Sequence, residues 1–307
     1  MKTCDIIVPT YNNAETLPLV LEELNRQEIV SSWKVRVLLC DDGSTDATRE
    51  MISRTKYCLE TISISGEHHG AAAARNRGIK ASRADILLFL GADIILRPSA
   101  LAAHLSFHEQ HPSTQDGALG FVMWDPRLRP TPLMQWAIHG GPQNDFDTLL
   151  GEKIVDARKY LYGSNLSLKR DLISSDLFSE QFTGYGHEDT ELGDRLATRG
   201  LRLHILERAT GLHHHFYSTS AFLKRQYAAG KSRHLYAKLL HLPSPESEFS
   251  FRHRLQLFLY PFLIAPLLTS VVRLTSRRYT LPRLFSHAAA YAYRRGVVAG
   301  IPRKLSK

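Results

Sequence analysis

The chain has 307 residues, of which 43% are hydrophobic and 22% are charged, and its formal net charge is +9. This is the composition of a globular protein with ample length for a core, either as one large domain or as a domain with an appendage. Acidic residues become rare after Glu248 while Arg and Lys continue to the end, which predicts a polyanionic partner. Anionic lipid, nucleic acid and a phosphorylated substrate all fit, and a merely solvated basic surface is the alternative.

A structural zinc site is not expected from the three cysteines, because no Cys-x-x-Cys or Cys/His ligand spacing occurs. Cys4 and Cys40 lie in apolar strand-like runs, and Cys58 does not. This odd count favours buried thiols in a reducing cytosol. A strand begins almost at once, at Cys4–Val8, so no signal peptide is expected.

The first third of the chain alternates between strand and helix patterns. Strands are expected at Asp5–Pro9, Lys34–Cys40, Thr61–Ser65 and Asp85–Leu90, and helices at Ala14–Gln27, Asp46–Thr55 and Gly70–Ala81. This alternation predicts an α/β fold with a mostly parallel sheet flanked by helices. The segments Thr10-Tyr11-Asn12, Asp41-Asp42 and Gly91-Ala92-Asp93 each follow a strand, so we expect them to line one crevice.

The middle of the chain is less regular. A strand is expected at Gly117–Trp124, and the Pro- and Gly-rich residues 125–153 are expected to form a long loop. Gly163-Ser164-Asn165 interrupts the chain before a short strand. The remaining expected elements are a helix at Asp189–Arg199, strands at Arg202–Leu206 and Thr210–His214, and a basic helix at Phe222–Leu240.

One uncharged apolar segment, Leu255–Val272, raises the question of a membrane. Its length is at the lower limit for a spanning helix, and Pro261 and Pro266 would kink or break one. Three interpretations stay open: two short helices in the membrane interface, a true span, and a buried hairpin. Arg residues on both sides favour the interfacial one, because anionic headgroups would hold them.

Two adjacent carboxylates, Glu188 and Asp189, follow the glycine-broken run Gly184-Tyr185-Gly186-His187 and open a helix. A carboxylate there can be held by backbone N–H groups and still face a bound substrate, which suits a general base. The alternative is a helix N-cap whose charge is favourable near the helix dipole.

Three motifs in order carry a resemblance to a known family. They are Ile7-Val8-Pro9-Thr10-Tyr11-Asn12-Asn13, Asp41-Asp42-Gly43-Ser44-Thr45-Asp46 and Ala74-Arg75-Asn76-Arg77-Gly78. With this spacing the chain resembles the inverting family 2 glycosyltransferases of the GT-A fold over about residues 4–230. The resemblance implies a GT-A domain at 1–235, a Rossmann-like sheet flanked by helices. Residues 236–307 would then form a helical extension that contacts a membrane interface or a partner.

The resemblance also implies a nucleotide-sugar site. Residues in the positions that contact the nucleotide are Pro9, Thr10, Tyr11, Asp41, Asp42, His69, Arg75, Ala92 and Lys231. A carboxylate on the Asp41-Asp42 turn can accept the N3–H of uracil or a ribose hydroxyl, although an Asx-turn that caps the next helix is the alternative. Arg75 would hold phosphate or serve as a structural ion-pair partner. The basic helix that carries Lys231 would close over the diphosphate or present a solvated face.

Gly91-Ala92-Asp93 occupies the place of the family's Asp-x-Asp motif, which binds Mn²⁺ or Mg²⁺. Asp93 corresponds to the second aspartate, the usual direct ligand, whereas Gly91 departs from the pattern and puts tight metal binding in doubt. His213 is expected as the third ligand by its place after a strand. His215 would share its strand face, because side chains alternate along a strand. A surface histidine run is the alternative.

The same resemblance assigns the two carboxylates. Asp189 would deprotonate the acceptor hydroxyl, and Glu188 would orient the acceptor or the loop. Tyr185 would shape the acceptor side of the site.

The sequence therefore predicts an inverting, metal-dependent glycosyltransferase that uses a UDP-sugar at the cytoplasmic face of a membrane, with a sugar or lipid-linked acceptor. The main alternative is a non-catalytic GT-A-like protein that binds nucleotide or carbohydrate, and Gly91 favours it. A nucleotidyltransferase should show a glycine-rich loop after the first strand, which Pro9-Thr10-Tyr11 is not. Nucleic-acid binding is not expected, because the basic tail lacks interleaved aromatic residues.

Overall fold

The computed structural model describes residues 1–301 except 30, 55–57, 144–145, 152, 174–176, 264–269, 273 and 277–280. One mixed sheet forms its centre, in the order β3-β2-β1-β4-β8-β6-β9-β5, and β7 pairs with β9. The strands are β1 (Lys2–Thr10), β2 (Trp33–Asp41), β3 (Glu60–Ser65), β4 (Ile86–Leu90), β5 (Ile94–Leu96), β6 (Asp116–Trp124), β7 (Ile154–Val155), β8 (Asn165–Lys169) and β9 (Arg202–His213). This is the α/β architecture that the sequence predicts.

The sheet has a parallel half and a mixed half. β3, β2, β1 and β4 are all parallel, while β8 runs antiparallel to both β4 and β6. All five residues of β4 are buried, as expected for a strand with helices on both faces. The parallel half therefore brings the ends of β1, β2 and β4 to one edge of the sheet.

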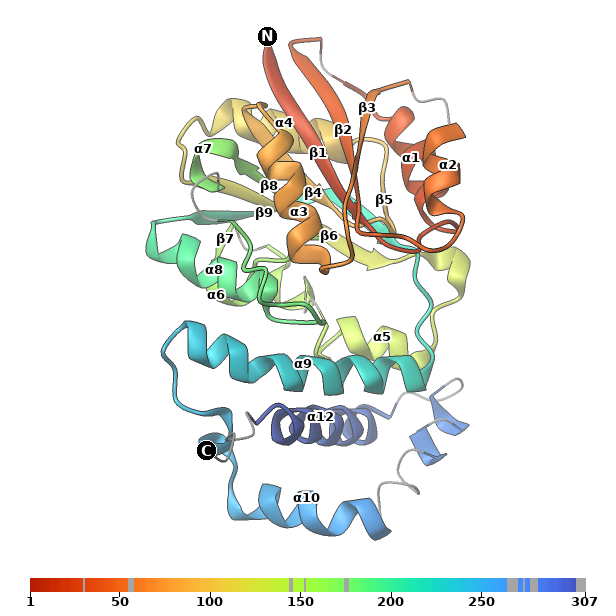
Figure 1. The fold of residues 1–307 in the computed structure, drawn as a ribbon, viewed down its shortest axis with the longest axis vertical. Helices are drawn as coiled ribbons and strands as arrows, with labels where there is room; N and C mark the ends of the chain where they lie inside the picture. The colour runs from red at the N-terminus through yellow and green to blue at the C-terminus, as the bar shows by residue number, and fades with distance from the viewer. Residues whose placement is uncertain are drawn as a thin grey trace.

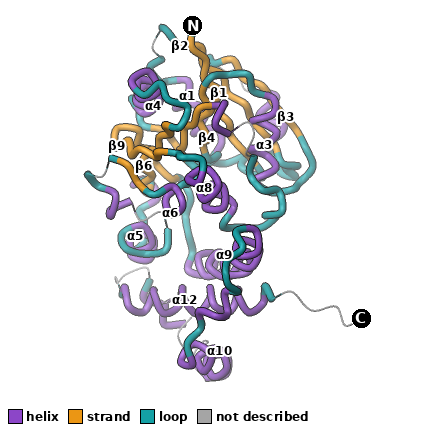
Figure 2. The backbone as a smooth tube through the Cα atoms, turned by 90° about the vertical axis from the view of Figure 1, so that its left-hand side faces the viewer, coloured by secondary structure: helices purple, strands orange, loops and turns teal. Residues whose placement is uncertain are grey.

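Helices cover both faces of the sheet (Figures 1 and 2). The helix α3 (Ala71–Ala81) packs on β1 and β2, and α4 (Ala100–Gln110) packs on β6 and β9 from the opposite side. The remaining helices of this part are α1 (Leu17–Asn25), α2 (Thr48–Arg54), α6 (Ala157–Tyr160), α7 (Arg170–Ile173) and α8 (Glu188–Thr198). The predicted alternation in the first third is confirmed to within a few residues at each boundary.

The expectation of a long loop over residues 125–153 is wrong. This stretch contains the helix α5 (Pro132–Ile138) and the 3₁₀ helices η1 (Pro126–Leu128) and η2 (Phe146–Leu149). Thr131 caps α5 by accepting a hydrogen bond from the Met134 N–H at 3.3 Å, and a proline occupies the first turn. The Pro and Gly content of this stretch favours a loop, whereas Thr131 followed by Pro132 is a local helix start signal.

The two strands expected at 202–206 and 210–214 form one strand, β9. Its register with β6 shifts between Gly120 and Val122, where the sheet is irregular. The buried Asn165 amide satisfies backbone carbonyls at this irregularity, donating to Phe121 O at 3.2 Å and to Ala209 O at 2.7 Å.

The C-terminal helices form a layer below the sheet (Figure 1). α9 (Thr219–Leu239) and α12 (Pro282–Ala299) pack against each other, and α10 (Phe251–Leu263) lies beyond α12. A second apolar cluster holds the layer together, made by Leu133, Trp136, Ala137, Phe222, Val272, Phe285, Ala288 and Ala289. The predicted domain boundary at residue 235 falls inside α9, and the division into two domains stays a prediction.

The apolar segment Leu255–Val272 is described only in part. α10 continues through Pro261 to Leu263, and residues 264–269 lie outside the described part of the chain. None of the described helices has the length and apolar character needed to span a membrane. All three interpretations of this segment therefore stay predictions.

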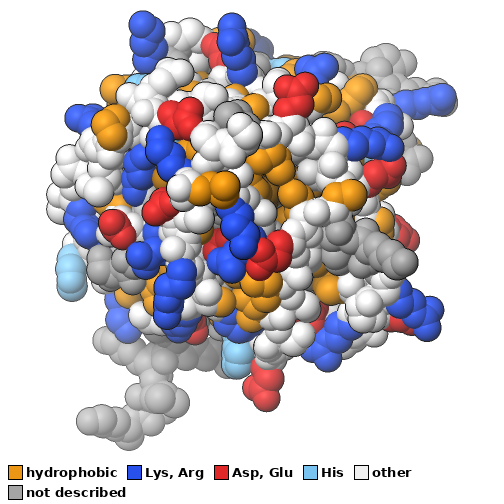
Figure 3. Space-filling model, turned by 90° about the horizontal axis from the view of Figure 1, so that it is seen from above, with side chains coloured by type: hydrophobic (Ala, Val, Ile, Leu, Met, Phe, Trp, Pro, Cys, Tyr) orange, Lys and Arg blue, Asp and Glu red, His pale blue; other side chains and the backbone are white. Residues whose placement is uncertain are grey.

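Charge and cysteine placement agree with a globular chain. Lys and Arg side chains are interspersed with Asp and Glu over the face shown in Figure 3. Cys4 and Cys40 are buried free thiols and Cys58 is exposed. Burial raises the pKa of the Cys40 thiol to about 12, so it stays protonated at neutral pH.

Candidate active site

A cavity of about 310 Å³ lies where β1, β2 and β4 end. It contains six of the predicted site residues: Pro9, Thr10, Tyr11, Asp42, Arg75 and Ala92, together with the predicted metal ligand Asp93. The other lining residues are Asn13, His68, Gly70, Ala71, Ala74 and Gly91. The three segments expected to converge therefore do so, because parallel strands end at the same edge.

One wall of this cavity is aromatic. The rings of Tyr11 and His68 stack with their centroids 4.0 Å apart and their planes 26° apart. Tyr11 is 40% exposed, so the pair presents a flat surface on which a planar base can stack. The sequence pointed to His69, but that side chain does not line the cavity and lies 3.7 Å from Glu67. No local signal distinguishes His68 from His69.

The two aspartates of the β2 turn are buried and already hydrogen-bonded. Asp41 accepts from the Ser44 N–H at 3.2 Å and from Arg49 Nε at 2.6 Å, which is the turn geometry of the alternative interpretation. Asp42 accepts from the Gly70 N–H at 2.7 Å and from Arg77 at 2.7 Å. Asp42 lines the cavity whereas Asp41 does not.

Asp93, which lines this cavity, forms a cluster with His213 and His215. One ligand atom from each residue lies within 4.8 Å of the other two. His213 Nε2 is 3.1 Å from Asp93 Oδ2, and His215 Nδ1 is 3.6 Å from the same oxygen. Burial raises the pKa of Asp93, but the two imidazoles outweigh it and hold this pKa below its usual range.

This donor set fits a divalent cation. One carboxylate oxygen and two imidazole nitrogens would hold a divalent transition-metal ion such as Mn²⁺, which would supply positive charge beside the cavity. β9 ends at His213, so the predicted strand face does not extend to His215. Beyond the strand, His215 joins the cluster while His214 Nδ1 lies 2.7 Å from Asp125 Oδ2. The Trp124 ring stacks on the His213 imidazole, with the ring centroids 4.9 Å apart, and so restricts the orientation of this candidate ligand.

Arg75 joins this cavity to the Glu188–Asp189 pair. Its Nη1 lies 3.3 Å from Asp189 Oδ1 and 3.4 Å from Glu188 Oε1, and its Nη2 donates to the Gly163 carbonyl at 3.3 Å. Arg75 therefore forms the ion pairs that one of the two sequence interpretations predicts. These ion pairs do not exclude a contact between Arg75 and phosphate.

The Asp189 carboxylate is held by more hydrogen bonds than the Glu188 carboxylate. Asp189 Oδ2 accepts the Gly163 N–H at 2.9 Å, so both carboxylate oxygens have a partner. Burial and the nearby Asp189 charge raise the pKa of Glu188, and Arg75 opposes them. The helix begins at Glu188 with His187 as its N-cap residue in the left-handed region, so Asp189 is not itself the cap.

Arg225 of the basic helix α9 contacts two tyrosines near the site, although neither Arg225 nor Lys231 lines the cavity. The Arg225 guanidinium lies over the Tyr185 ring at 4.1 Å and over the Tyr217 ring at 4.6 Å. Tyr217 in turn lies against the His215 ring at 4.7 Å, which connects the loop before Asp189 to the cation cluster. Lys231 does not line the cavity, and its backbone faces Gly296 and Gly300 of α12.

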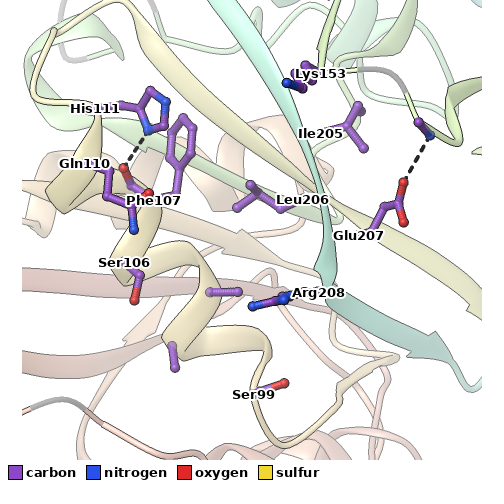
Figure 4. Close-up of a pocket in the computed structure, with 13 residues that line it drawn as sticks. Ser99, Ser106, Phe107, Gln110, His111, Lys153, Ile205, Leu206, Glu207 and Arg208 are labelled. Atoms are coloured by element: carbon purple, nitrogen blue, oxygen red, sulfur yellow. Dashed lines mark hydrogen bonds between the residues drawn. The ribbon is translucent and has the colours of Figure 1, made fainter.

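A larger hollow of about 690 Å³ lies elsewhere, between α4 and β9 (Figure 4). His111 packs on Phe107 there, and the Glu207 carboxylate accepts the Gly151 N–H at 3.0 Å. None of the predicted site residues lines it. Volume alone therefore does not identify the site; the convergence of carboxylates and imidazoles does.

Comparisons with known proteins agree with this geometry. The profile of the glycosyl transferase family 2 matches residues 5–149. Validoxylamine A glucosyltransferase of Streptomyces hygroscopicus subsp. jinggangensis is 28% identical over 231 residues, covering 67% of this chain and 54% of that protein. The glycosyltransferase YfnE of Bacillus subtilis is 26% identical over 251 residues, covering 68% of this chain and 64% of that protein. The chain spans about half the length of the first curated relatives that it matches.

Solved structures share the fold. The mannosyltransferase PcManGT from Pyrobaculum calidifontis, in complex with GDP-Man and Mn²⁺, superposes with a TM-score of 0.63 at 19% identity, over 99% of this chain and 88% of that one. TarS 1–349 of S. aureus in complex with UDP superposes with a TM-score of 0.56 at 18% identity, over 98% and 90%. At these identities the likeness establishes the GT-A architecture.

Proposed function

The chain belongs to glycosyltransferase family 2, and from that premise we propose that it moves a sugar from a nucleotide-sugar donor to an acceptor hydroxyl with inversion. The observation that carries this proposal is the Arg75 link. One buried guanidinium contacts the candidate base Asp189 and also lines the cavity that contains Asp42 and Asp93. A donor in that cavity and an acceptor at Asp189 would therefore be neighbours.

In the proposed reaction Asp189 takes the proton of the acceptor hydroxyl. The acceptor oxygen forms the new bond to the anomeric carbon, and the bond to the nucleoside diphosphate breaks on the opposite side. The Gly163 N–H and Arg75 hold the carboxylate in one orientation, so it does not need to reorganise when the acceptor binds. Glu188, which has a raised pKa, would orient the acceptor or the loop.

The nucleotide would lie along the ends of β1 and β2. Tyr11 and His68 would stack on the base, and the backbone around Gly70 would approach the ribose. A Mn²⁺ or Mg²⁺ held by Asp93, His213 and His215 would neutralise charge on the departing diphosphate. We propose UDP as the nucleotide, because the related TarS fold was solved with UDP and with UDP-GlcNAc.

A donor panel tests this function. UDP-, GDP- and dTDP-sugars are incubated with the protein with and without Mn²⁺, and nucleotide release and nucleotide binding are both measured. We expect Mn²⁺-stimulated release from a UDP-sugar. Binding without release would favour the non-catalytic alternative, and neither binding nor release would exclude a donor site.

The Asp189→Asn variant tests the assignment of the base. The amide keeps the size of the side chain but cannot accept the proton, so transfer should fall by about 10²–10⁴-fold while UDP affinity changes little. Asp171→Asn is the matched control, because the Asp171 carboxylate is 73% exposed in α7, outside the cavity. A comparable loss of UDP affinity in Asp189→Asn would show that Asp189 is structural.

We further propose that the C-terminal helices contact the cytoplasmic face of a membrane, where a lipid-linked acceptor would be found. Phe251 is 80% exposed and Leu274 is 77% exposed, with Arg252, Arg254 and Arg283 nearby in sequence. Apolar side chains flanked by exposed arginines suit an anionic lipid surface.

Co-sedimentation with phosphatidylglycerol/phosphatidylcholine vesicles checks this contact. The double substitution Phe251→Ser and Leu274→Ser should lower the bound fraction several-fold, because both exposed apolar contacts are lost. Leu150→Ser is the control, since Leu150 is 61% exposed but belongs to the segment after η2. Equal binding by the double variant and the wild type would refute the contact.

A further inference from the structure

A second cavity, of about 540 Å³, lies between the catalytic part of the molecule and α12. Its walls come from the end of α5, from the loop before α8, from α9 and from α12. Its lining residues are Trp136, Gly140, Gly141, Pro142, Tyr185, Gly186, His187, Gln226, Ala229, Ser286, Ala289, Ala290, Tyr293 and Arg294. The cavity therefore exists only because the C-terminal layer packs beneath the loop.

Some residues that line this cavity directly precede the candidate base in the sequence. Tyr185, Gly186 and His187 line it, and Glu188 and Asp189 follow directly. Ser232 of α9 donates to the Tyr185 carbonyl at 3.0 Å, which holds the loop against the helix. A molecule seated in the cavity would thus lie beside the loop that presents Asp189.

The walls are mainly apolar and aromatic. Trp136, Tyr185 and Tyr293 contribute rings, and Ala229, Ala289 and Ala290 keep the floor open because their side chains are short. Burial, followed by the charge of Arg233, lowers the pKa of His187 to about 4, so its ring is neutral at pH 7. The Arg294 guanidinium donates to Gln256 of α10 at 3.1 Å and thereby has a partner within the chain.

We infer that this cavity is the acceptor subsite and that it selects acceptors whose hydroxyl is carried by an apolar body, such as a ring or an alkyl chain. The inference rests on the proposed glycosyl transfer and adds the class of acceptor. Aromatic and alanine walls gain free energy by removing an apolar surface from water, and an acceptor made only of sugar offers these walls less apolar surface than a ring or an alkyl chain does. α12 would then act as the element that determines acceptor specificity.

Binding of simple glucosides tests the inference without turnover. Methyl, phenyl and octyl β-D-glucoside are titrated by calorimetry in the presence of UDP and Mn²⁺, with octyl glucoside kept below its micelle concentration. We expect phenyl or octyl glucoside to bind at least about ten-fold more tightly than methyl glucoside. Comparing the affinities of phenyl and octyl glucoside shows whether the cavity prefers an aromatic ring or an alkyl chain.

Substitutions on α12 locate the preference. Ala290→Trp fills the cavity and should reduce the preference to less than about two-fold, and Ala290→Leu should reduce it in part. Ala299→Trp is the matched control, because Ala299 is exposed on the same helix and outside the cavity. Circular dichroism and UDP affinity, measured on each variant, establish that it is folded.

The outcomes separate this inference from the proposed function. Equal binding of all three glucosides by the wild type, or an unchanged preference in folded Ala290→Trp, would overturn the inference while UDP-sugar release still supports the function. A preference that Ala290→Trp abolishes, in a protein that releases no nucleotide, would support the apolar subsite and contradict the catalytic proposal.

Discussion

Gly91 leaves room for the Asp93 carboxylate to face the two histidines. A Cβ added at Gly91 would lie 2.9 Å from Asp93 Oδ1 and 2.9 Å from Ile94 Cγ1, closer than such contacts normally come. Gly91→Ala should therefore displace Asp93 and lower Mn²⁺ affinity by about 10-fold or more. Calorimetric titration of Mn²⁺ measures this, with Gly184→Ala as control, because an added methyl there meets nothing within 4 Å. Unchanged Mn²⁺ affinity in Gly91→Ala would mean that Asp93 does not bind the ion.

Two buried histidines predict sensitivity to acid. His104 Nδ1 and His108 Nε2 each lie 2.8 Å from Ser167 Oγ. Burial lowers the pKa of His104 to about 4 and that of His108 to about 2. Both values are below the unfolded value of about 6.5, so the unfolded chain takes up protons first. Stability is then complete above about pH 6.5 and falls as the pH drops toward 4.

Urea unfolding at pH 7 and pH 5 checks this expectation. Each histidine should lower the free energy of unfolding by about 2 kcal/mol between these two pH values. In His108→Gln that fall should shrink by the contribution of one histidine, because glutamine does not titrate. Equal unfolding free energies at the two pH values would contradict a neutral buried pair.

At the scale of elements, the crossing of α9 and α12 depends on glycine. A Cβ on Gly230 would lie 2.0 Å from the Tyr293 carbonyl oxygen, and one on Gly296 would lie 2.0 Å from the Tyr227 carbonyl oxygen. Gly296→Val should push the helices apart and lower stability by about 1–3 kcal/mol, which thermal unfolding would measure. Ala299→Val, on the exposed side of α12, is the control. Equal melting temperatures for both variants would show that the helices do not pack this closely.

At the scale of the whole molecule, the C-terminal layer covers an apolar cluster that the sheet does not cover. Trp136 is 6% exposed and Phe222 is 2% exposed, and both pack against Phe285 of α12. Deleting residues 282–307 should expose Trp136, so the melting temperature should fall and tryptophan emission should shift to longer wavelength. UDP affinity should persist, because the nucleotide cavity is formed by residues 9–93. An unshifted emission spectrum would contradict the packing of α12.

Much of the N-terminal part of the fold could be predicted because its signals are local. The apolar runs of β1, β2 and β4 and the polar residues after them lie within short stretches, so strand, turn and crevice follow from the order of the chain. The helix α5 also begins with a local signal, but the prolines and glycines around it favour a loop and obscure that signal. The apolar face of α12 packs against α5 and α9, which are far away in the sequence. No local pattern could therefore predict this packing.

The strand face predicted for His213 and His215 is not observed, because β9 ends at His213 and His215 lies beyond it. The sequence by itself determined the α/β class and the convergence of Thr10, Asp42 and Asp93. Each follows from hydrophobic period and strand alternation, which act over a few residues. Only the tertiary structure decided that His68 rather than His69 stacks on Tyr11, that Arg75 pairs with Asp189, and that α12 completes a cavity lined by the loop before α8. These contacts join segments distant in the chain, so the packing of whole elements, not local preference, selects them.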